Sequence, residues 1–192
     1  MTYEELKEIL LKEKPSIILK EREDELFDLI PELKYSKGFN QNNPWHIYDV
    51  LEHTYHVLDG VDSDLVLRLT ALFHDIGKPY TYTETNGVGR FTGHWDVSKK
   101  IFLEFAEKHN IDEPTKDLVS KLIFLHDLNV DDMSDKQKDS LSTSEILKLF
   151  KIKRADILAQ NPEKHEEVLD RYELDEEELL MGREKWKLNM LH

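Results

Sequence analysis

LVLRLTALFHDIGKP, the stretch at residues 65–79, carries the strongest structural signal in the sequence. Its apolar residues recur at helical spacing up to Phe73, which predicts a helix that Gly77 ends. His74 and Asp75 lie at the end of this apolar run, where burial is expected. Buried imidazole and carboxylate groups need polar partners, and a divalent cation can supply one. The stretch therefore predicts a buried helix that ends in a metal-capable pair.

Two further polar residues lie among apolar neighbours. His53 belongs to the preceding helical pattern, at a separation that suits two antiparallel helices with facing side chains. Asp156 lies in a late helical segment, KRADILAQN, again beside apolar positions. These two side chains and the His-Asp pair could therefore converge on one ion. Their nitrogen and oxygen donors suit Mn, Fe, Ni, Co, Zn or Mg, and they leave the choice among these metals open.

The rest of the chain is mostly helical in pattern. Thr2 and Glu5 predict a capping box for an N-terminal helix, and Asn43-Pro44 predicts the start of a helix that runs to Gly60. The segment 80–93 alternates Tyr and Thr around an Asn-Gly pair, which predicts a small hairpin or an ordered loop. The other predicted helices cover residues 24–30, 94–109, 114–127, 144–160 and 163–190. We therefore expect a single all-α domain over residues 1–192.

Composition excludes several classes of protein. The chain has 192 residues, enough for one domain with a sizeable core. It has no cysteine, which excludes disulfides, thiolate metal sites and cysteine nucleophiles. A charged start and the lack of a long apolar stretch argue against a signal peptide and a membrane span. The net charge of −14, from 26 Lys+Arg and 40 Asp+Glu, disfavours long nucleic acids. We expect a cytoplasmic protein with no membrane partner.

Four local motifs add a family resemblance. They are NPWHIYDVLEHT at 43–54, LFHDIGKP at 72–79, RFTGH at 90–94 and LH at 125–126. Together with Asp156 they resemble the HD-domain metal-dependent phosphohydrolases, most closely the HD module of bacterial CCA-adding tRNA nucleotidyltransferases and related stand-alone HD proteins. The resemblance covers roughly residues 40–160 and leaves flanking helices at 1–30 and 163–192. It does not include a nucleotidyltransferase head, so it does not imply nucleotide addition.

The resemblance implies an HD-domain helical bundle that holds one or two divalent metal ions. The ligands that it implies for the first ion are His53, His74, Asp75 and Asp156. His94 and His126 lie where two-metal relatives carry further histidines, and Asp75 would then bridge the two ions.

Three residues are candidates for contact with substrate. Lys78 could stabilise a phosphate or assist a leaving group, so we count it with Asp75 as a catalytic candidate; alternatively it complements the end of the helix. Arg90 could bind a phosphate through two hydrogen bonds, or it faces solvent. His46 lies on the same face of the predicted helix as His53, so we expect it to face the pocket and contact substrate.

These features favour an enzyme, a phosphatase or phosphodiesterase that acts on a nucleotide or a similar small phosphorylated molecule. A bound divalent ion would lower the pKa of its water and offset charge on a phosphoryl group. The alternative is a metal-containing module that binds or senses a nucleotide without turnover. The sequence leaves the substrate open, and it does not decide whether the flanking helices form a lid or a homodimer contact.

Overall fold

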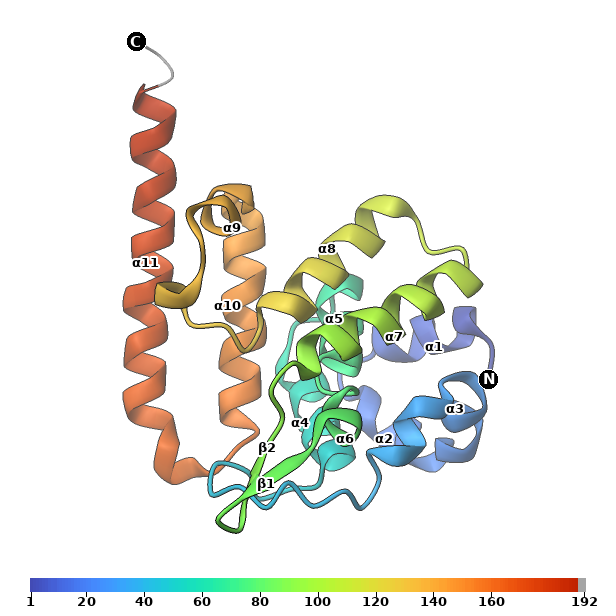
Figure 1. The fold of residues 1–192 in the computed structure, drawn as a ribbon. Coiled ribbons are helices and arrows are strands. Elements are labelled where there is room, and N and C mark those ends of the chain that lie inside the picture. Colours follow the sequence, from blue (N-terminus) through green and yellow to red (C-terminus); the bar gives the residue numbers. More distant parts are fainter. Residues whose placement is uncertain (190–192) are drawn as a thin grey trace.

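A computed structural model describes the backbone of residues 1–189 and the side chains of residues 1–182. The chain forms a bundle of helices with one small hairpin (Figure 1), so the all-α prediction is confirmed. The α-helices are α1 (Tyr3–Leu10), α2 (Pro15–Glu21), α3 (Glu23–Leu29), α4 (Val50–Gly60), α5 (Leu65–Phe73), α6 (Lys78–Thr81), α7 (His94–Lys108), α8 (Glu113–Leu125), α9 (Asp135–Ser140), α10 (Thr143–Leu158) and α11 (His165–Asn189). Short 3₁₀ helices join some of them: η1 (Pro31–Tyr35), η2 (Val130–Asp132) and η3 (Pro162–Lys164).

Helix α5 is the centre of the bundle. Every residue from Leu67 to Phe73 is buried, and the helix packs against α1, α4, α7, α8 and α10. The Asp64 side chain caps its start by accepting a hydrogen bond from the Leu67 N–H. Because α5 is surrounded, the residues that follow its last turn lie inside the molecule rather than at its surface.

Two helix boundaries differ from the sequence predictions by more than two residues. Helix α4 begins at Val50, not at Pro44, because the Asp49 side chain accepts the Glu52 N–H and serves as the N-cap. Helix α5 ends at Phe73, before Gly77, which instead precedes the short helix α6. A Cβ at Gly77 would lie 2.4 Å from the His94 carbonyl oxygen, so glycine at this position permits close packing against α7.

The predicted hairpin is present between residues 80 and 93. Strand β1 (Thr83–Thr85) pairs antiparallel with β2 (Val88–Arg90), and Thr83 faces Arg90 in the register. The turn residues Asn86 and Gly87 both have positive φ, 52° and 76°, as a tight two-residue hairpin turn requires. The prediction of a hairpin or ordered loop is therefore confirmed as a hairpin.

The flanking segments pack on the bundle. Helix α1 contacts α5, and α2 contacts α4. Helix α11 lies along α10 (Figure 1), and its Leu179 joins a buried cluster with Leu149 and Phe150. The predicted C-terminal helix is thus present as far as Asn189, and residues 190–192 lie outside the described part of the chain. Among the described residues, no helix combines the length and apolar composition that a membrane crossing requires.

Candidate metal centre

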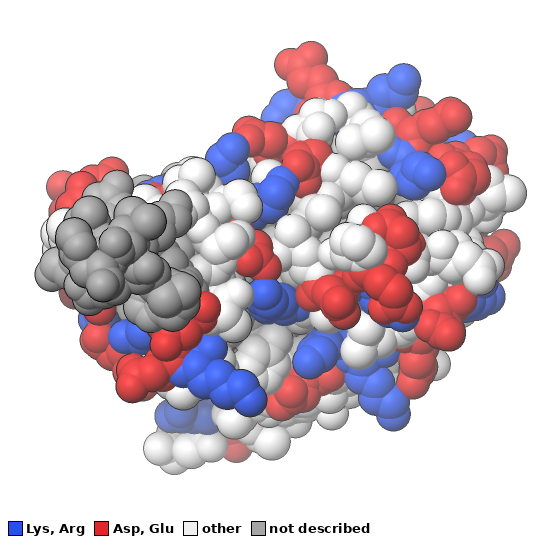
Figure 2. Space-filling model, turned by 90° about the horizontal axis from the view of Figure 1, so that it is seen from above, with Lys and Arg blue, Asp and Glu red and all other residues white. Residues whose placement is uncertain are grey.

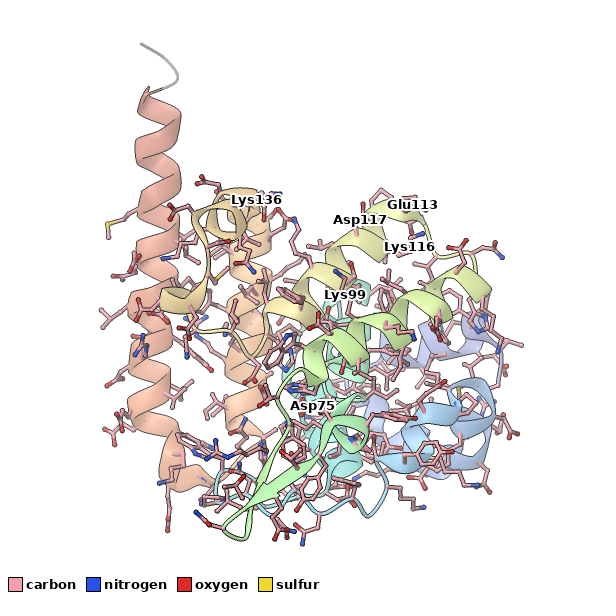
Figure 3. All side chains as sticks on the ribbon, viewed as in Figure 1. Asp75, Lys99, Glu113, Lys116, Asp117 and Lys136 are labelled. Carbon is pink, nitrogen blue, oxygen red and sulfur yellow. The ribbon has the colours of Figure 1, made fainter. Side chains whose placement is uncertain are left out.

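The structure brings together the six metal-ligand candidates predicted from the sequence. Figure 3 places the labelled Asp75 in the interior of the bundle, near the start of α7. Five helices or their ends supply the other donors. The six residues are His53 on α4, His74 and Asp75 after α5, His94 at the start of α7, His126 after α8, and Asp156 on α10. Two overlapping groups of three among them have ligand atoms within 4.8 Å of one another.

One side of the cluster surrounds the Oδ2 atom of Asp75. The Nε2 atoms of His53 and His74 each lie 3.3 Å from this oxygen. The Oδ1 atom of Asp156 lies 3.0 Å from His53 Nε2. Two imidazole nitrogens and two carboxylates therefore enclose one small volume, and this group of donors could hold a metal ion.

The other side of the cluster surrounds the Oδ1 atom of Asp75. His94 Nε2 lies 3.2 Å from this oxygen and His126 Nε2 lies 3.6 Å from it. The two Nε2 atoms are 3.3 Å apart. The two oxygens of Asp75 thus face two separate pairs of histidines, a geometry in which one carboxylate could contact two ions.

The histidines are oriented by their other ring nitrogens. In each ring Nδ1 lies close to a backbone carbonyl oxygen, which can only accept a hydrogen bond, so Nδ1 donates to it and Nε2 is turned toward the cluster. The carbonyls are those of Ala159 for His53 at 3.2 Å, Ala71 for His74 at 2.8 Å, Phe91 for His94 at 2.9 Å and Ile123 for His126 at 2.7 Å. Imidazole rings held in this way present Nε2 to a common point, as metal-ligating histidines do.

The carboxylates of the cluster are held in their ionised form. Burial would raise the pKa of Asp75, but His74 and Lys78 outweigh burial and hold this pKa well below its usual range. Burial opposes ionisation of Asp156 too, and the hydrogen bond from His53 overcomes it and lowers the pKa of Asp156. Both Asp75 oxygens are buried without a hydrogen bond of normal geometry among the described residues. Buried carboxylate oxygens of this kind, beside four aligned imidazoles and with only the Lys78 ammonium in an ion pair at Oδ2 among the described residues, fit a divalent cation.

Lys78 belongs to this cluster as well. Its side chain is buried, and Nζ lies 2.6 Å from Asp75 Oδ2 and 2.9 Å from Gln41 Oε1. The ammonium group therefore contacts side chains of the cluster rather than the carbonyl groups at the end of α5.

A cavity of about 580 Å³ opens from the cluster. Arg90 on β2 lines it and is exposed, with no contact to the six donors among the described residues. His46 lines it too, but from the irregular segment before α4 rather than from the helix face that the sequence predicts. Its ring packs edge-on against His53, with centroids 5.5 Å apart. Burial lowers the pKa of His46 to about 3, so its imidazole is neutral near pH 7.

The sequence analysis did not identify several residues of the site. Gln160 Nε2 donates to Asp156 Oδ1 at 3.0 Å, and its place one helical turn after Asp156 is a signal that could have found it. Lys153 is buried and donates to the carbonyl oxygens of His126 and Leu128, at 2.7 and 2.8 Å. Arg171 of α11 lines the cavity, which no local pattern indicated.

Comparison with known proteins gives one family match and several curated relatives. A family model described as the HD domain matches residues 46–184. An A-adding tRNA nucleotidyltransferase of Deinococcus radiodurans is 38% identical over 84 residues, which is 40% of this chain and 19% of that protein. A CC-adding tRNA nucleotidyltransferase of Thermus thermophilus is 37% identical over 107 residues, 51% of this chain and 24% of that protein.

A more distant relative is a bifunctional uridylyltransferase/uridylyl-removing enzyme of Hydrogenovibrio crunogenus. It is 28% identical over 143 residues, 63% of this chain and 15% of that protein. The matches thus extend over less than a quarter of the length of each of these three relatives.

Proposed function

This chain belongs to the HD-domain family, and on that premise we propose that it is a metal-dependent phosphohydrolase, a phosphatase or phosphodiesterase for a nucleotide or similar small phosphorylated molecule. The observation that carries the proposal is the donor cluster around Asp75. Four imidazoles have Nδ1 bound to carbonyl groups and Nε2 turned inward, and they meet a buried carboxylate whose oxygens have no hydrogen bond of normal geometry among the described residues.

The proposed ligands form two groups that share Asp75. The first ion would be held by His53, His74, Asp75 and Asp156. A second would be held by Asp75, His94 and His126. When bound, divalent ions lower the pKa of coordinated water toward neutrality and offset the charge that develops on a phosphoryl group.

The chain's own side chains have separate tasks in this proposal. The Lys78 ammonium lies beside the cluster and would bind a phosphate oxygen. Arg90, on the cavity wall, would bind the same group through its fork of N–H donors. Asp75 would also orient the attacking water. His46 is neutral and could donate or accept a hydrogen bond to the substrate without adding charge.

Charge supports a small substrate. The chain carries a net charge of −14, and Figure 2 shows acidic and basic side chains intermixed on the face that it presents. A long polyanion would be repelled by the whole molecule, whereas a small phosphate meets local cations over a distance shorter than the screening length of about 8 Å. The names of two relatives include tRNA, but the charge of this chain favours a nucleotide-sized ligand.

The test measures metal content and hydrolysis on protein purified without a metal-affinity step. Wild type should contain one or two equivalents of a divalent transition metal by plasma mass spectrometry. It should also hydrolyse p-nitrophenyl phosphate or its bis-ester with that metal added. Asp75→Asn keeps the shape of the side chain but removes its charge, so both properties should be lost. Asp62→Asn makes the same change at an exposed acid and should resemble wild type.

The outcomes separate the alternatives. Metal without turnover of either ester would favour a module that binds or senses its ligand. Protein that takes up no Mn²⁺, Mg²⁺, Fe²⁺, Co²⁺, Ni²⁺ or Zn²⁺ would contradict the proposal.

A further inference from the structure

Gln41 is a buried amide in the irregular segment that precedes α4. Its side chain uses both ends: Oε1 accepts a hydrogen bond from Lys78 Nζ at 2.9 Å, and Nε2 donates to the Tyr48 carbonyl oxygen at 3.2 Å. Only 1% of the residue is exposed. A buried amide with both ends matched has a fixed orientation, so Gln41 offers Lys78 an acceptor at a fixed place.

The segment around Gln41 is itself fixed against the hairpin. The Asn42 carbonyl accepts the Gly89 N–H at 2.8 Å, and the Asn43 side chain donates to the Gly89 carbonyl at 3.1 Å. A Cβ at Gly89 would lie 2.1 Å from the Gln41 carbonyl oxygen, so the two backbones are in direct contact. The position of Gln41 is thus set by β2, the strand that carries Arg90 into the cavity wall.

Two side-chain acceptors lie within hydrogen-bond distance of Lys78 Nζ among the described residues. An ammonium group has three N–H donors. One faces Asp75 Oδ2 at 2.6 Å and one faces Gln41 Oε1. The Phe91 ring, 5.3 Å from Nζ, covers another side. Lys78 lines the cavity, and its Nζ has no third acceptor among the described residues, which leaves a donor for a ligand there.

We propose that Gln41 is a positioning residue, which holds the Lys78 ammonium so that its free N–H meets the phosphate of a ligand in the cavity. The inference rests on the proposed function, since it assigns Lys78 to phosphate binding. An amide suits this role because it accepts a hydrogen bond and leaves the positive charge of the ammonium in place. A glutamate at the same position would neutralise that charge. Without the amide, Asp75 is the remaining acceptor, and the ammonium would be drawn onto the carboxylate and away from the ligand.

The experiment measures the affinity of the Mn²⁺-loaded protein for inorganic phosphate by isothermal titration calorimetry. Gln41→Met keeps the length of the side chain and removes the acceptor. It should weaken phosphate binding by about tenfold, the scale of one charge-assisted hydrogen bond, with Mn²⁺ stoichiometry unchanged. Gln137 caps α9 and does not line the cavity, so the Gln137→Met variant should bind phosphate as wild type does.

A double-mutant cycle distinguishes positioning from a general structural effect. If Gln41 acts through Lys78, Gln41→Met should change phosphate affinity little in a Lys78→Met background. Equal losses in both backgrounds, or no loss in either, would overturn the inference. Gln41→Asn, whose amide is too short to reach Lys78, repeats the test if the methionine variant has a lowered melting temperature. The titration uses another divalent ion if wild type prefers it to Mn²⁺; a wild type that binds none of the six ions tested above would contradict the proposed function itself, and this inference with it.

Discussion

Each histidine of the cluster is oriented by one backbone carbonyl. For three of them, His74, His94 and His126, the carbonyl lies three residues earlier in the chain, so the ring folds back over a local turn. His53 instead reaches Ala159 across the bundle. Local sequence therefore determines the orientation of three rings, whereas the fourth depends on the packing of α4 against the end of α10.

The second ion position can be tested at one residue. His126→Ala removes one of the two imidazoles that face Asp75 Oδ1 and leaves the group around Oδ2 intact. We expect bound metal, measured by plasma mass spectrometry, to fall to about half because two ligands remain for the second ion. His56→Ala, at an exposed histidine of α4, is the control. An unchanged ratio of metal to protein would indicate a one-metal site.

The buried ammonium group of Lys153 should make the free energy of unfolding depend on pH. Burial lowers the pKa of its ammonium from 10.5 to about 8. The folded chain therefore loses this proton at lower pH than the unfolded chain does, and between these pKa values stability rises with pH. The unfolding free energy of wild type, relative to Lys153→Met, should rise by about 3 kcal/mol from pH 7.5 to 10.5.

Urea denaturation of both proteins at the two pH values measures this difference. Lys151→Met, at a half-exposed lysine of the same helix, controls for the loss of a lysine as such. A difference between wild type and Lys153→Met that is independent of pH would mean that Lys153 is charged in the fold up to the pKa of a free lysine.

The grouping of the six candidate donors could be expected, because five of them lie in motifs that resemble the HD family and Asp156 is an acid in an apolar helical segment; their role as metal ligands stays a prediction. Gln41 and Lys153 could not be expected, because their roles depend on distant contacts. Gln41 meets Lys78 across 37 positions of chain, and Lys153 meets the His126 carbonyl across 27. A buried lysine on a helix also has the same local pattern as an exposed one.

At the scale of helices and strands, caps explain where the predictions succeeded and failed. The capping box of Thr2 and Glu5 predicted the start of α1 correctly. Asn43-Pro44 is an equally good start signal for a helix, yet the Asn43 side chain donates a hydrogen bond to the hairpin. The helix begins later, after the Asp49 cap. Helix α9 was not predicted, although Ser134 and Gln137 form a capping box before it.

A substitution at Gly77 tests how closely α6 and α7 must approach each other. A methyl group at Gly77 would lie 2.4 Å from the His94 carbonyl oxygen and 2.8 Å from the Ser98 nitrogen, both backbone atoms of α7. Gly77→Ala should therefore displace the start of α7 and lower the unfolding free energy by about 1–3 kcal/mol.

The same displacement would move His94, so the affinity for a second ion should fall as well. Gly182→Ala, in α11 where a Cβ meets nothing within 4 Å, is the control and should be neutral or stabilising. Chemical denaturation and metal titration of both variants check these outcomes, and a Gly77→Ala protein equal to wild type in both would contradict the close packing.

At the scale of the whole molecule, distant segments complete the cavity. Arg171 and Tyr172 of α11 line it together with Arg90 of β2. Tyr172 also packs against Phe150 of α10, with ring centroids 6.1 Å apart. This arrangement could not be predicted, because the acidic pattern of α11 does not indicate which face packs inward. A homodimer contact, one of the two roles considered for the flanking helices, stays a prediction.

Metal binding should stabilise the entire fold. The proposed ligands come from α4, α10 and the ends of α5, α7 and α8, so the site exists only when these helices are assembled. An ion at 100 times its dissociation constant should stabilise the folded state by about 2.7 kcal/mol and raise the melting temperature. Differential scanning fluorimetry with and without Mn²⁺ measures the shift, which Asp75→Asn should abolish. An equal shift in that variant would place the stabilising ion elsewhere.

The histidines of α7 and α8 both lie at one end of this helix pair. His94 begins α7 and His126 follows α8, while the connection at residues 109–112 joins the opposite ends. Helix α7 has 15 residues, so that connection is about 20 Å from the donors. Asn110, exposed and with a positive φ of 53°, lies at its tip. An epitope, a fluorophore or a whole inserted domain could therefore be attached at Asn110 without disturbing the donor cluster.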